Sequence, residues 1–240
     1  MDVLYILGNG SRWRNNEIKY SLRSLEKHGQ NYGRVFITGE NPDFINDNIK
    51  YNYYPDKYIC NINHLLKVLY TFQTTDILDD ILVNYDDNFF IQDVDITKYP
   101  FYYNREEIPE SFDLSSTYTK SKIFTRNILL NLGKPIKDFG VHCPVIYNRQ
   151  KFYDFVEKFQ KYNEMNSKNV GISVRNAYLN NLEVKGEYLP DVKILRILTK
   201  HEIEQKIQGR DVFSIGNNII SGGIVEFLEE NYPNKSRWER

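Results

Sequence analysis

The sequence predicts a single α/β domain in which a mixed, mostly parallel sheet is flanked by helices. Continuous apolar runs at residues 3–7, 35–38 and 81–85 are typical of strands that are buried on both faces. The stretches between these runs carry apolar residues at helical spacing, as expected of crossover helices that join parallel strands. The 240 residues suffice for one domain, with a nucleotide-binding half at residues 1–98 and an acceptor half at residues 99–240.

The first half of the chain alternates between predicted strands and helices. The first strand ends at a tight loop, Gly8-Asn9-Gly10, and Asn15 or Asn16 caps the helix that follows. The predicted elements are a strand at residues 3–7, a helix ending near residue 28, strands at 35–38 and 48–54, a helix over 62–69 and a strand at 81–85. The repeated order of strand, helix and strand is the unit from which parallel sheets are built.

The second half is less regular. Residues 100–120 lack a clear period and are rich in Tyr, Pro, Glu and Ser, so we expect a long loop or partial helix that acts as a lid near the site. The other predicted elements are a helix within residues 120–137 that ends at Gly133 and Pro135, helices at residues 152–159, 171–181 and 223–231, a strand with a polar interruption at 141–147 and an edge strand at 183–189. We expect residues 235–240 to form a basic, exposed tail.

Composition limits the class of protein. No apolar run approaches the length of a membrane-spanning helix, and the chain opens straight into a strand, so we expect a soluble protein without a secretory leader. A net charge of −1 argues against a uniformly basic nucleic-acid binder. Cys60 and Cys143 have neither metal-ligand nor redox spacing, which fits a reducing compartment. We therefore expect a cytoplasmic location in a bacterium or in a virus-infected host cell.

The most informative motif is the acidic pair Asp86 and Asp87, which follows the predicted strand at residues 81–85. Adjacent acids are common in ordinary turns. Here, however, apolar sequence resumes directly after them, so the two charges interrupt a buried stretch and require compensation. Carboxylates at the carboxyl end of a parallel strand face the ligand crevice, where they can hold a divalent cation against a diphosphate. We predict that Asp86 and Asp87 are metal ligands and that Asn84 and Tyr85 orient a nucleotide-sugar donor.

His142 is the histidine that the sequence singles out, because it interrupts an apolar stretch four residues after Asp138. A buried histidine is often only a hydrogen-bonded core residue. The alternative is that His142 completes the metal site or acts as a base, with Asp138 beside it. His28 is predicted to end a helix, and His64 and His201 are predicted to lie on helix surfaces.

Several other residues are candidate phosphate contacts. The loop Gly8-Asn9-Gly10 lacks the third glycine of a dinucleotide-binding fingerprint, because Trp13 takes that position, and the chain has no phosphate-binding lysine loop. Phosphates would then be bound by this loop and by side chains, although these side chains are equally compatible with solvent-exposed charges. The candidate side chains are Arg12, Arg14 and Arg175.

A basic stretch precedes the predicted strand at residues 141–147. Such a stretch is usually a solvated face, and otherwise it would suit an anionic acceptor such as DNA or an acidic glycan. Its members are Lys120, Lys122, Arg126, Lys134 and Lys137.

Residues 16–27, 34–38 and 84–90 together resemble the central block of the Stealth proteins, and His142 with Pro144 is similar to the next block of that family. Stealth proteins are sugar-phosphate transferases of bacterial capsule synthesis and eukaryotic lysosomal sorting. The resemblance covers about the first 150 residues. It implies a GT-A-like (Rossmann-like) sheet, whose strand-end acids bind a divalent metal and a nucleotide diphosphate.

The chain departs from the Stealth pattern in three respects. Lys19 stands where the family often has Arg, Tyr85 is inserted between Asn84 and the acids, and the usual opening block and extra domains are missing. These departures favour plain glycosyl transfer over transfer of a sugar phosphate.

The predicted function is a glycosyltransferase that uses Mg²⁺ or Mn²⁺ and a nucleotide-sugar donor, with a UDP-sugar as the first candidate. The acceptor hydroxyl would belong to a glycan or, as a minor alternative, to a hydroxymethylated DNA base. The predicted catalytic residues are Asp87, His142 and Asp138. The alternatives are a Stealth-type hexose-1-phosphate transferase and a non-catalytic protein that binds sugars or nucleotides.

Overall fold

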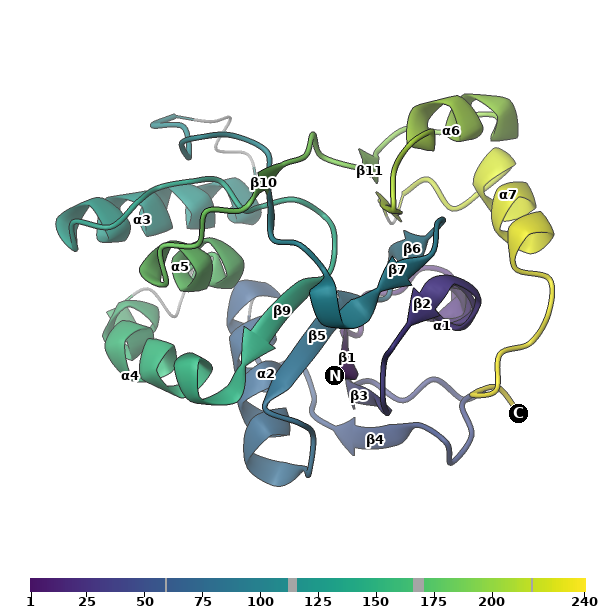
Figure 1. Cartoon of the computed structure of the whole chain (residues 1–240), viewed down its shortest axis with the longest axis horizontal. Coiled ribbons are helices and arrows are strands. Elements are labelled where there is room, and N and C mark those ends of the chain that lie inside the picture. The colour runs from purple at the N-terminus through teal and green to yellow at the C-terminus, as the bar shows by residue number, and fades with distance from the viewer. Residues whose placement is uncertain (59, 112–115, 166–170, 217) are drawn as a thin grey trace.

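A mixed five-stranded sheet lies at the centre of the molecule (Figure 1). The structure is a computed structural model that describes residues 1–58, 60–111, 116–165, 171–216 and 218–240. In spatial order the strands are β4 (Lys50–Tyr53), β3 (Val35–Gly39), β1 (Asp2–Leu7), β5 (Asp80–Tyr85) and β9 (Val145–Asn148). The first four are parallel and β9 runs antiparallel to β5, so the predicted mixed, mostly parallel sheet is confirmed.

The two faces of the sheet belong to two different hydrophobic clusters. Because successive side chains of a strand point to opposite faces, β1 divides its residues between them. Val3, Tyr5 and Leu7 pack on the side of helix α1 (Asn16–His28), whereas Leu4 and Ile6 pack on the opposite side. This double burial explains why residues 3–7 of the strand form a continuous apolar run.

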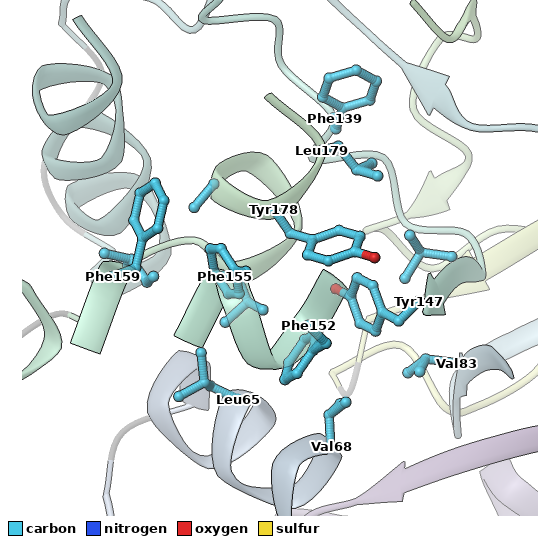
Figure 2. Packing of buried hydrophobic residues seen from close by; sticks show 14 of the residues in the cluster. Leu65, Val68, Val83, Phe139, Tyr147, Phe152, Phe155, Phe159, Tyr178 and Leu179 are labelled. Carbon is cyan, nitrogen blue, oxygen red and sulfur yellow. The ribbon is translucent and has the colours of Figure 1, made fainter. Parts of the chain in front are cut away.

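The hydrophobic cluster on the second face includes residues of four helices, and α3 packs there against α5. These helices are α2 (Cys60–Thr74), α3 (Thr117–Asn131), α4 (Arg149–Met165) and α5 (Val174–Asn181). Figure 2 shows the aromatic centre of this layer, where Tyr147 from β9 meets Phe152 and Phe155 from α4 and Tyr178 from α5. The ring centroids of Tyr147 and Tyr178 are 4.8 Å apart, and those of Tyr147 and Phe152 are 5.1 Å apart. These contacts fix α5 against the central sheet, and α5 carries Arg175.

A second, smaller sheet adjoins the carboxyl end of β5. Its strands are β11 (Lys193–Ile194), β12 (Val212–Ile215) and β6 (Asn88–Phe90), with β12 in the middle. Helices α6 (Lys200–Ile207) and α7 (Gly223–Asn231) pack on this sheet through a third hydrophobic cluster that includes Phe89, Phe213 and Phe227. Since β6 follows β5 after a turn at residues 86–87, the small sheet is directly joined to the acidic pair.

The remaining elements are short. They are β2 (Gly29–Gln30), β7 (Val94–Asp95), a 3₁₀ turn at Ile96–Lys98, β8 (Tyr102–Tyr103) and β10 (Glu187–Tyr188). Strand β2 pairs with β7, and β8 pairs with β10. Across the described part of the chain, no helix combines the length and apolar composition that crossing a membrane requires.

One predicted helix ends where it was expected to end, and one predicted strand is shortened. The helix expected within residues 120–137, with its end at Gly133 and Pro135, is α3 (Thr117–Asn131), and Gly133 adopts the left-handed conformation that ends it. The strand expected at 141–147 is shortened to Val145–Asn148. Residues 139–143 instead make two successive close turns, in which the amide of Val141 donates to the Phe139 carbonyl and that of Cys143 to the Val141 carbonyl.

The prediction of an exposed tail is confirmed for Lys235, Arg237 and Arg240, but it is wrong for Ser236, Trp238 and Glu239, which are buried. Trp238 is buried, and the carboxylate of Glu239 makes two hydrogen bonds of 2.7 Å with the guanidinium of Arg23 in α1. Glu239 also forms an isolated bridge with Ile45. The end of the chain is thus a packed strap that crosses α1, because the apolar ring of Trp238 and the buried ion pair hold it there.

Candidate active site

A cavity of about 1080 Å³ opens at the carboxyl ends of β1 and β5. Its walls are the loop at residues 8–11, the turn at 85–88, the segment at 140–142 and the start of α5 at 173–175. Parallel sheets bind ligands at this edge, because the strand ends leave a crevice between the loops that follow them. The cavity therefore joins the acidic pair, His142 and Arg175, which lie far apart in the sequence.

The acidic turn is held by two serines of α1 that are three residues apart on one helix face. Ser21 donates a hydrogen bond of 2.5 Å to the Asn88 carbonyl, and Ser24 accepts one of 3.0 Å from the Phe90 amide. The two bonds fix the backbone after Asp86 and Asp87. These two hydrogen bonds give a structural role to Ser21 and Ser24, the two serines in the helix that resembles the Stealth block.

Asp87 is already paired with groups from the small sheet. Its Oδ2 accepts hydrogen bonds of 3.0 Å each from Nζ of Lys193 and Oγ of Ser214. Lys193 and Ser214 are direct neighbours in the pairing of β11 with β12. The Asp87 carbonyl also accepts from the Ile215 amide, so the small sheet holds both backbone and side chain of this acid.

Asp86 is less well compensated. Burial, together with the negative charges of Asp87 and Glu17, raises the pKa of Asp86 to about 7. Two adjacent carboxylates of this kind have the hard oxygen atoms that Mg²⁺ and Mn²⁺ prefer, and a cation would relieve their repulsion. Among the residues that the structure describes, however, no three His, Cys, Asp or Glu side chains form a group that could hold a metal. Bound substrate would have to complete the coordination.

Asn84 and Tyr85 lie on opposite faces of β5, because neighbouring side chains of a strand alternate. Asn84 is fully buried on the α1 side, where its Nδ2 donates to Oη of Tyr5 and its Oδ1 accepts from Asn88. Tyr85 lines the cavity. Of the two residues predicted to orient a donor, only Tyr85 faces the space in which a donor would lie.

His142 is oriented by Asp191. The Nδ1 atom of His142 lies 2.8 Å from Oδ2 and 3.0 Å from Oδ1 of Asp191, and the backbone amide of His142 also donates to this carboxylate. Burial alone would raise the pKa of Asp191, but the hydrogen bonds from the side chain and backbone amide of His142, together with the electrostatic attraction of the imidazole, lower that pKa to about 2. Because Asp191 engages Nδ1, the Nε2 atom is left for the cavity.

Asp138 lies elsewhere. Its carboxylate accepts hydrogen bonds from Nζ of Lys122 at 2.8 Å, from the Gly140 amide at 3.0 Å and from Nδ2 of Asn176 at 3.3 Å. Asp138 thus holds the turn before His142, and the carboxylate that contacts the imidazole is Asp191.

Arg175 fastens the backbone on both sides of His142. Its Nη1 donates to the Val141 carbonyl and its Nη2 to the Cys143 carbonyl, and its guanidinium carbon lies 5.6 Å from the centre of the Tyr85 ring. Arg175 is buried and lines the cavity. Contact of Arg175 with a phosphate stays a prediction. Its hydrogen bonds to the carbonyls of Val141 and Cys143 already show that Arg175 holds the His142 segment in position.

His64 lines the cavity, so its prediction as a helix-surface residue is wrong. Its Nδ1 is 3.1 Å from Oη of Tyr85, and its Nε2 is 3.4 Å from Oη of Tyr147. Burial, followed by the charges of Arg175 and Lys67, lowers the pKa of His64 to about 3. His64 is therefore a neutral hydrogen-bonding residue between two tyrosines.

The glycine loop is supported by a buried lysine that the sequence did not single out. Lys67 is 1% exposed, and its Nζ donates to the Leu7 carbonyl at 2.7 Å and to Asp56 at 2.5 Å. The second oxygen of Asp56 accepts from the Asn9 amide at 3.1 Å. Gly8, Asn9 and Gly10 all line the cavity, and their contact with a phosphate stays a prediction.

The other predicted cationic contacts are not among the residues that line the cavity. Arg12 donates to Oδ1 of Asn218, and Arg14 is exposed in a left-handed conformation. In the basic stretch, four of the five side chains are paired with acids. These pairs are Lys122 with Asp138, Arg126 with Glu110, Lys134 with Glu183 and Lys137 with Glu106.

The predicted lid is described in part. Its residues 112–115 lie outside the described residues. Of the described part, Ser116 and Tyr118 line the cavity, and the Tyr118 ring lies 6.0 Å from the His142 ring.

Sequence reasoning missed Asp191, which contacts His142, and Lys193, which contacts Asp87. Lys193 begins β11, and Asp191 precedes it by two residues. A usable signal was present, because polar Asp191 and Lys193 alternate with apolar Val192 and Ile194. This pattern is typical of a strand with one buried face and one face toward solvent or a ligand.

A scan against models of known protein families finds no match to this chain, and a search of curated proteins finds none either. The resemblance to Stealth proteins and to the GT-A fold therefore stays a prediction that depends on the quoted segments.

Proposed function

We propose that the chain is a metal-dependent glycosyltransferase that moves a sugar from a nucleotide-sugar donor to an acceptor hydroxyl. The observation that carries the proposal is the cavity, which places Asp86 and Asp87 on one wall and His142 on another. Its volume of about 1080 Å³ lies at the upper end of ordinary ligand sites, which suits a donor and an acceptor bound together.

Asp86 and Asp87 would hold the Mg²⁺ or Mn²⁺. When bound, the cation supplies charge neutralisation at the leaving diphosphate. The raised pKa of Asp86 favours this assignment, because it marks a carboxylate pair whose repulsion is incompletely relieved by the protein itself. Two carboxylates also suffice for Mg²⁺ in sites where substrate phosphates and water provide the other ligands.

His142 is the base in this proposal. Asp191 fixes the imidazole through Nδ1, and Nε2 takes the proton of the acceptor hydroxyl as its oxygen forms the new bond to the anomeric carbon. The bond from that carbon to the phosphate oxygen breaks, and the nucleoside diphosphate leaves with the electron pair. Arg175 keeps the His142 segment in place through the carbonyls of Val141 and Cys143.

The proposal is tested by incubating the protein with a panel of sugar nucleotides, with Mn²⁺ or with EDTA, and measuring the nucleotide that is released. We expect release of a nucleoside diphosphate from at least one donor, abolished by EDTA and reduced at least about 100-fold by Asp87→Asn. Asp93→Asn is the matched control, because Asp93 is exposed and pairs with His28.

Release of a nucleoside monophosphate, with a product heavier by one phosphate, would instead identify sugar-phosphate transfer. Binding without any nucleotide release above background would identify a binding protein. Full activity of Asp87→Asn would refute the assigned metal site.

A further inference from the structure

Lys193 places a positive charge on the acid that the proposed function assigns to a metal. Its Nζ lies 3.0 Å from Oδ2 of Asp87, and Ser214 donates to the same oxygen. The side chains of Lys193 and Asp87 are 19% and 17% exposed, so water screens their attraction only in part. The ammonium of Lys193 therefore lies where a divalent cation would have to bind.

The position of Lys193 is built by the fold. Lys193 and Ser214 face each other in the parallel pair of β11 and β12, and β12 pairs in turn with β6, which follows the acidic turn. Val192 and Ile194, on either side of Lys193, are buried. The strand thus directs the lysine toward the acids, and Lys193 and Asp87 both line the cavity.

The remaining charges of the site favour replacement of the ion pair between Lys193 and Asp87 when a divalent cation binds. Asp86 adjoins Asp87 in the same turn and lines the same cavity, so the one ammonium of Lys193 faces two carboxylates and does not balance them. A divalent cation neutralises both acids. The lysine would then lie in the same cavity without its carboxylate, next to the negative charges of a diphosphate.

We propose that Lys193 is a displaceable counterion that neutralises Asp87 in the empty site and pairs with the diphosphate of the donor once a divalent cation binds there. The inference rests on the proposed function, since it requires a metal at the acidic pair. It assigns Lys193 two successive partners. Its consequence is that Lys193 opposes binding of the cation alone and favours binding of the cation together with a diphosphate.

The test measures Mn²⁺ binding to the full chain by titration calorimetry and then UDP binding at saturating Mn²⁺. Lys193→Met removes the charge at nearly constant length, and we expect it to tighten Mn²⁺ binding by about tenfold and to weaken UDP binding by about tenfold. Lys193→Arg keeps the charge and should bind both ligands within about twofold of the wild type.

Lys57→Met is the control for general electrostatics. Lys57 lines the same cavity, but its ammonium lies 5.3 Å from the Tyr54 ring centre. We expect its Mn²⁺ affinity to stay within about twofold of the wild type, because a charge without direct contact is screened. The opposite directions of the two effects separate displacement from simple damage, which would weaken both ligands.

Equal Mn²⁺ affinity in the wild type and Lys193→Met, or an equal gain in Lys57→Met, would overturn the inference. Equal UDP affinity in the wild type and Lys193→Met would overturn the second role of the lysine. In these cases the proposed function still stands if the wild type binds Mn²⁺ and Asp87→Asn does not. Absence of Mn²⁺ binding in the wild type and in every Lys193 variant would reject both the metal site and the inference.

Discussion

The proposed role of His142 as a base requires a fixed orientation of its imidazole, and the contact with Asp191 fixes the ring. The carboxylate contacts both Nδ1 and the backbone amide of His142, so it fixes the ring and its backbone together. A residue that acts through another in this way affects the rate more than the binding of substrate.

We expect Asp191→Asn to lower kcat by about 100-fold while KM changes little, because an amide cannot stabilise the protonated imidazole. The measurement is steady-state kinetics with the donor that the protein turns over. Asp211→Asn is the control, since the Asp211 carboxylate accepts from Tyr102 at 3.0 Å and does not line the cavity. An unchanged kcat in Asp191→Asn would remove Asp191 from the mechanism.

His64 links the cavity to the stability of the protein. Its pKa is lowered to about 3 in the folded state, whereas an unfolded histidine has a pKa of about 6.5. Between these values the unfolded chain binds a proton that the folded chain does not bind. The contribution of neutral His64 to the free energy of unfolding is therefore complete above pH 6.5 and is lost as the pH falls toward 3.

We expect the free energy of unfolding of His64→Gln to depend less steeply on pH between 6 and 4.5 than that of the wild type. The difference in slope has an upper limit of about 1.4 kcal/mol per pH unit, the value for one proton. Urea unfolding at several pH values measures it, with His201→Gln as the control because the His201 side chain is exposed. Identical slopes for His64→Gln and wild type would show that His64 titrates normally in the folded protein.

His142 and His64 show which residue environments the sequence pattern could predict and which it could not. His142 stood out because it interrupts an apolar stretch, and it does line the cavity. His64 occupies an ordinary helical position, and its environment is set by burial, by its contacts with Tyr85 and Tyr147, which are 21 and 83 residues away, and by the charges of Arg175 and Lys67. Such long-range contacts leave no local trace in the sequence.

At the scale of elements, the strap that ends the chain is held to α1 by one buried ion pair. The side chains of Arg23 and Glu239 are 8% and 2% exposed, and Arg23 also donates to the Tyr232 carbonyl. Loss of one partner leaves the other charge buried without compensation, which is costlier than loss of both.

We expect Glu239→Leu to lower the free energy of unfolding by about 3–5 kcal/mol, and Arg23→Met with Glu239→Leu to lower it by less than that single change. Urea unfolding of the wild type, both single variants and the double variant gives the coupling. If the two single effects simply add, the strap is held by its apolar contacts and the ion pair is incidental.

Elements buried on both faces were the easiest to predict. Residues 81–85 are apolar almost throughout, and β5 covers them as Asp80–Tyr85. The segment at 141–147 is equally apolar, yet its first half forms turns. There Arg175 and Asp138 bind the backbone, and these tertiary contacts outweigh the local preference for a strand.

For the whole molecule, the site lies where the two halves of the chain meet. The first half supplies the acidic pair and the glycine loop, and the second supplies His142, Arg175 and Lys193. Strand β11 belongs to the same small sheet as β6 (Figure 1), although about 100 residues separate the two strands in the sequence. The sequence predicted the sheet and the acidic pair at its edge. The partners of Asp87, which are Lys193 and Ser214, lie 106 and 127 residues away, so residue spacing could not predict them.

A crystal structure of the protein grown with Mn²⁺ and UDP tests the account most directly, because the anomalous signal of manganese locates the metal independently of the protein density. We expect one strong anomalous peak in contact with the carboxylates of Asp86 and Asp87, with the diphosphate of UDP beside it in the cavity. A nucleotide bound away from this cavity, or acids that contact no metal while UDP is bound, would contradict the proposed transferase site.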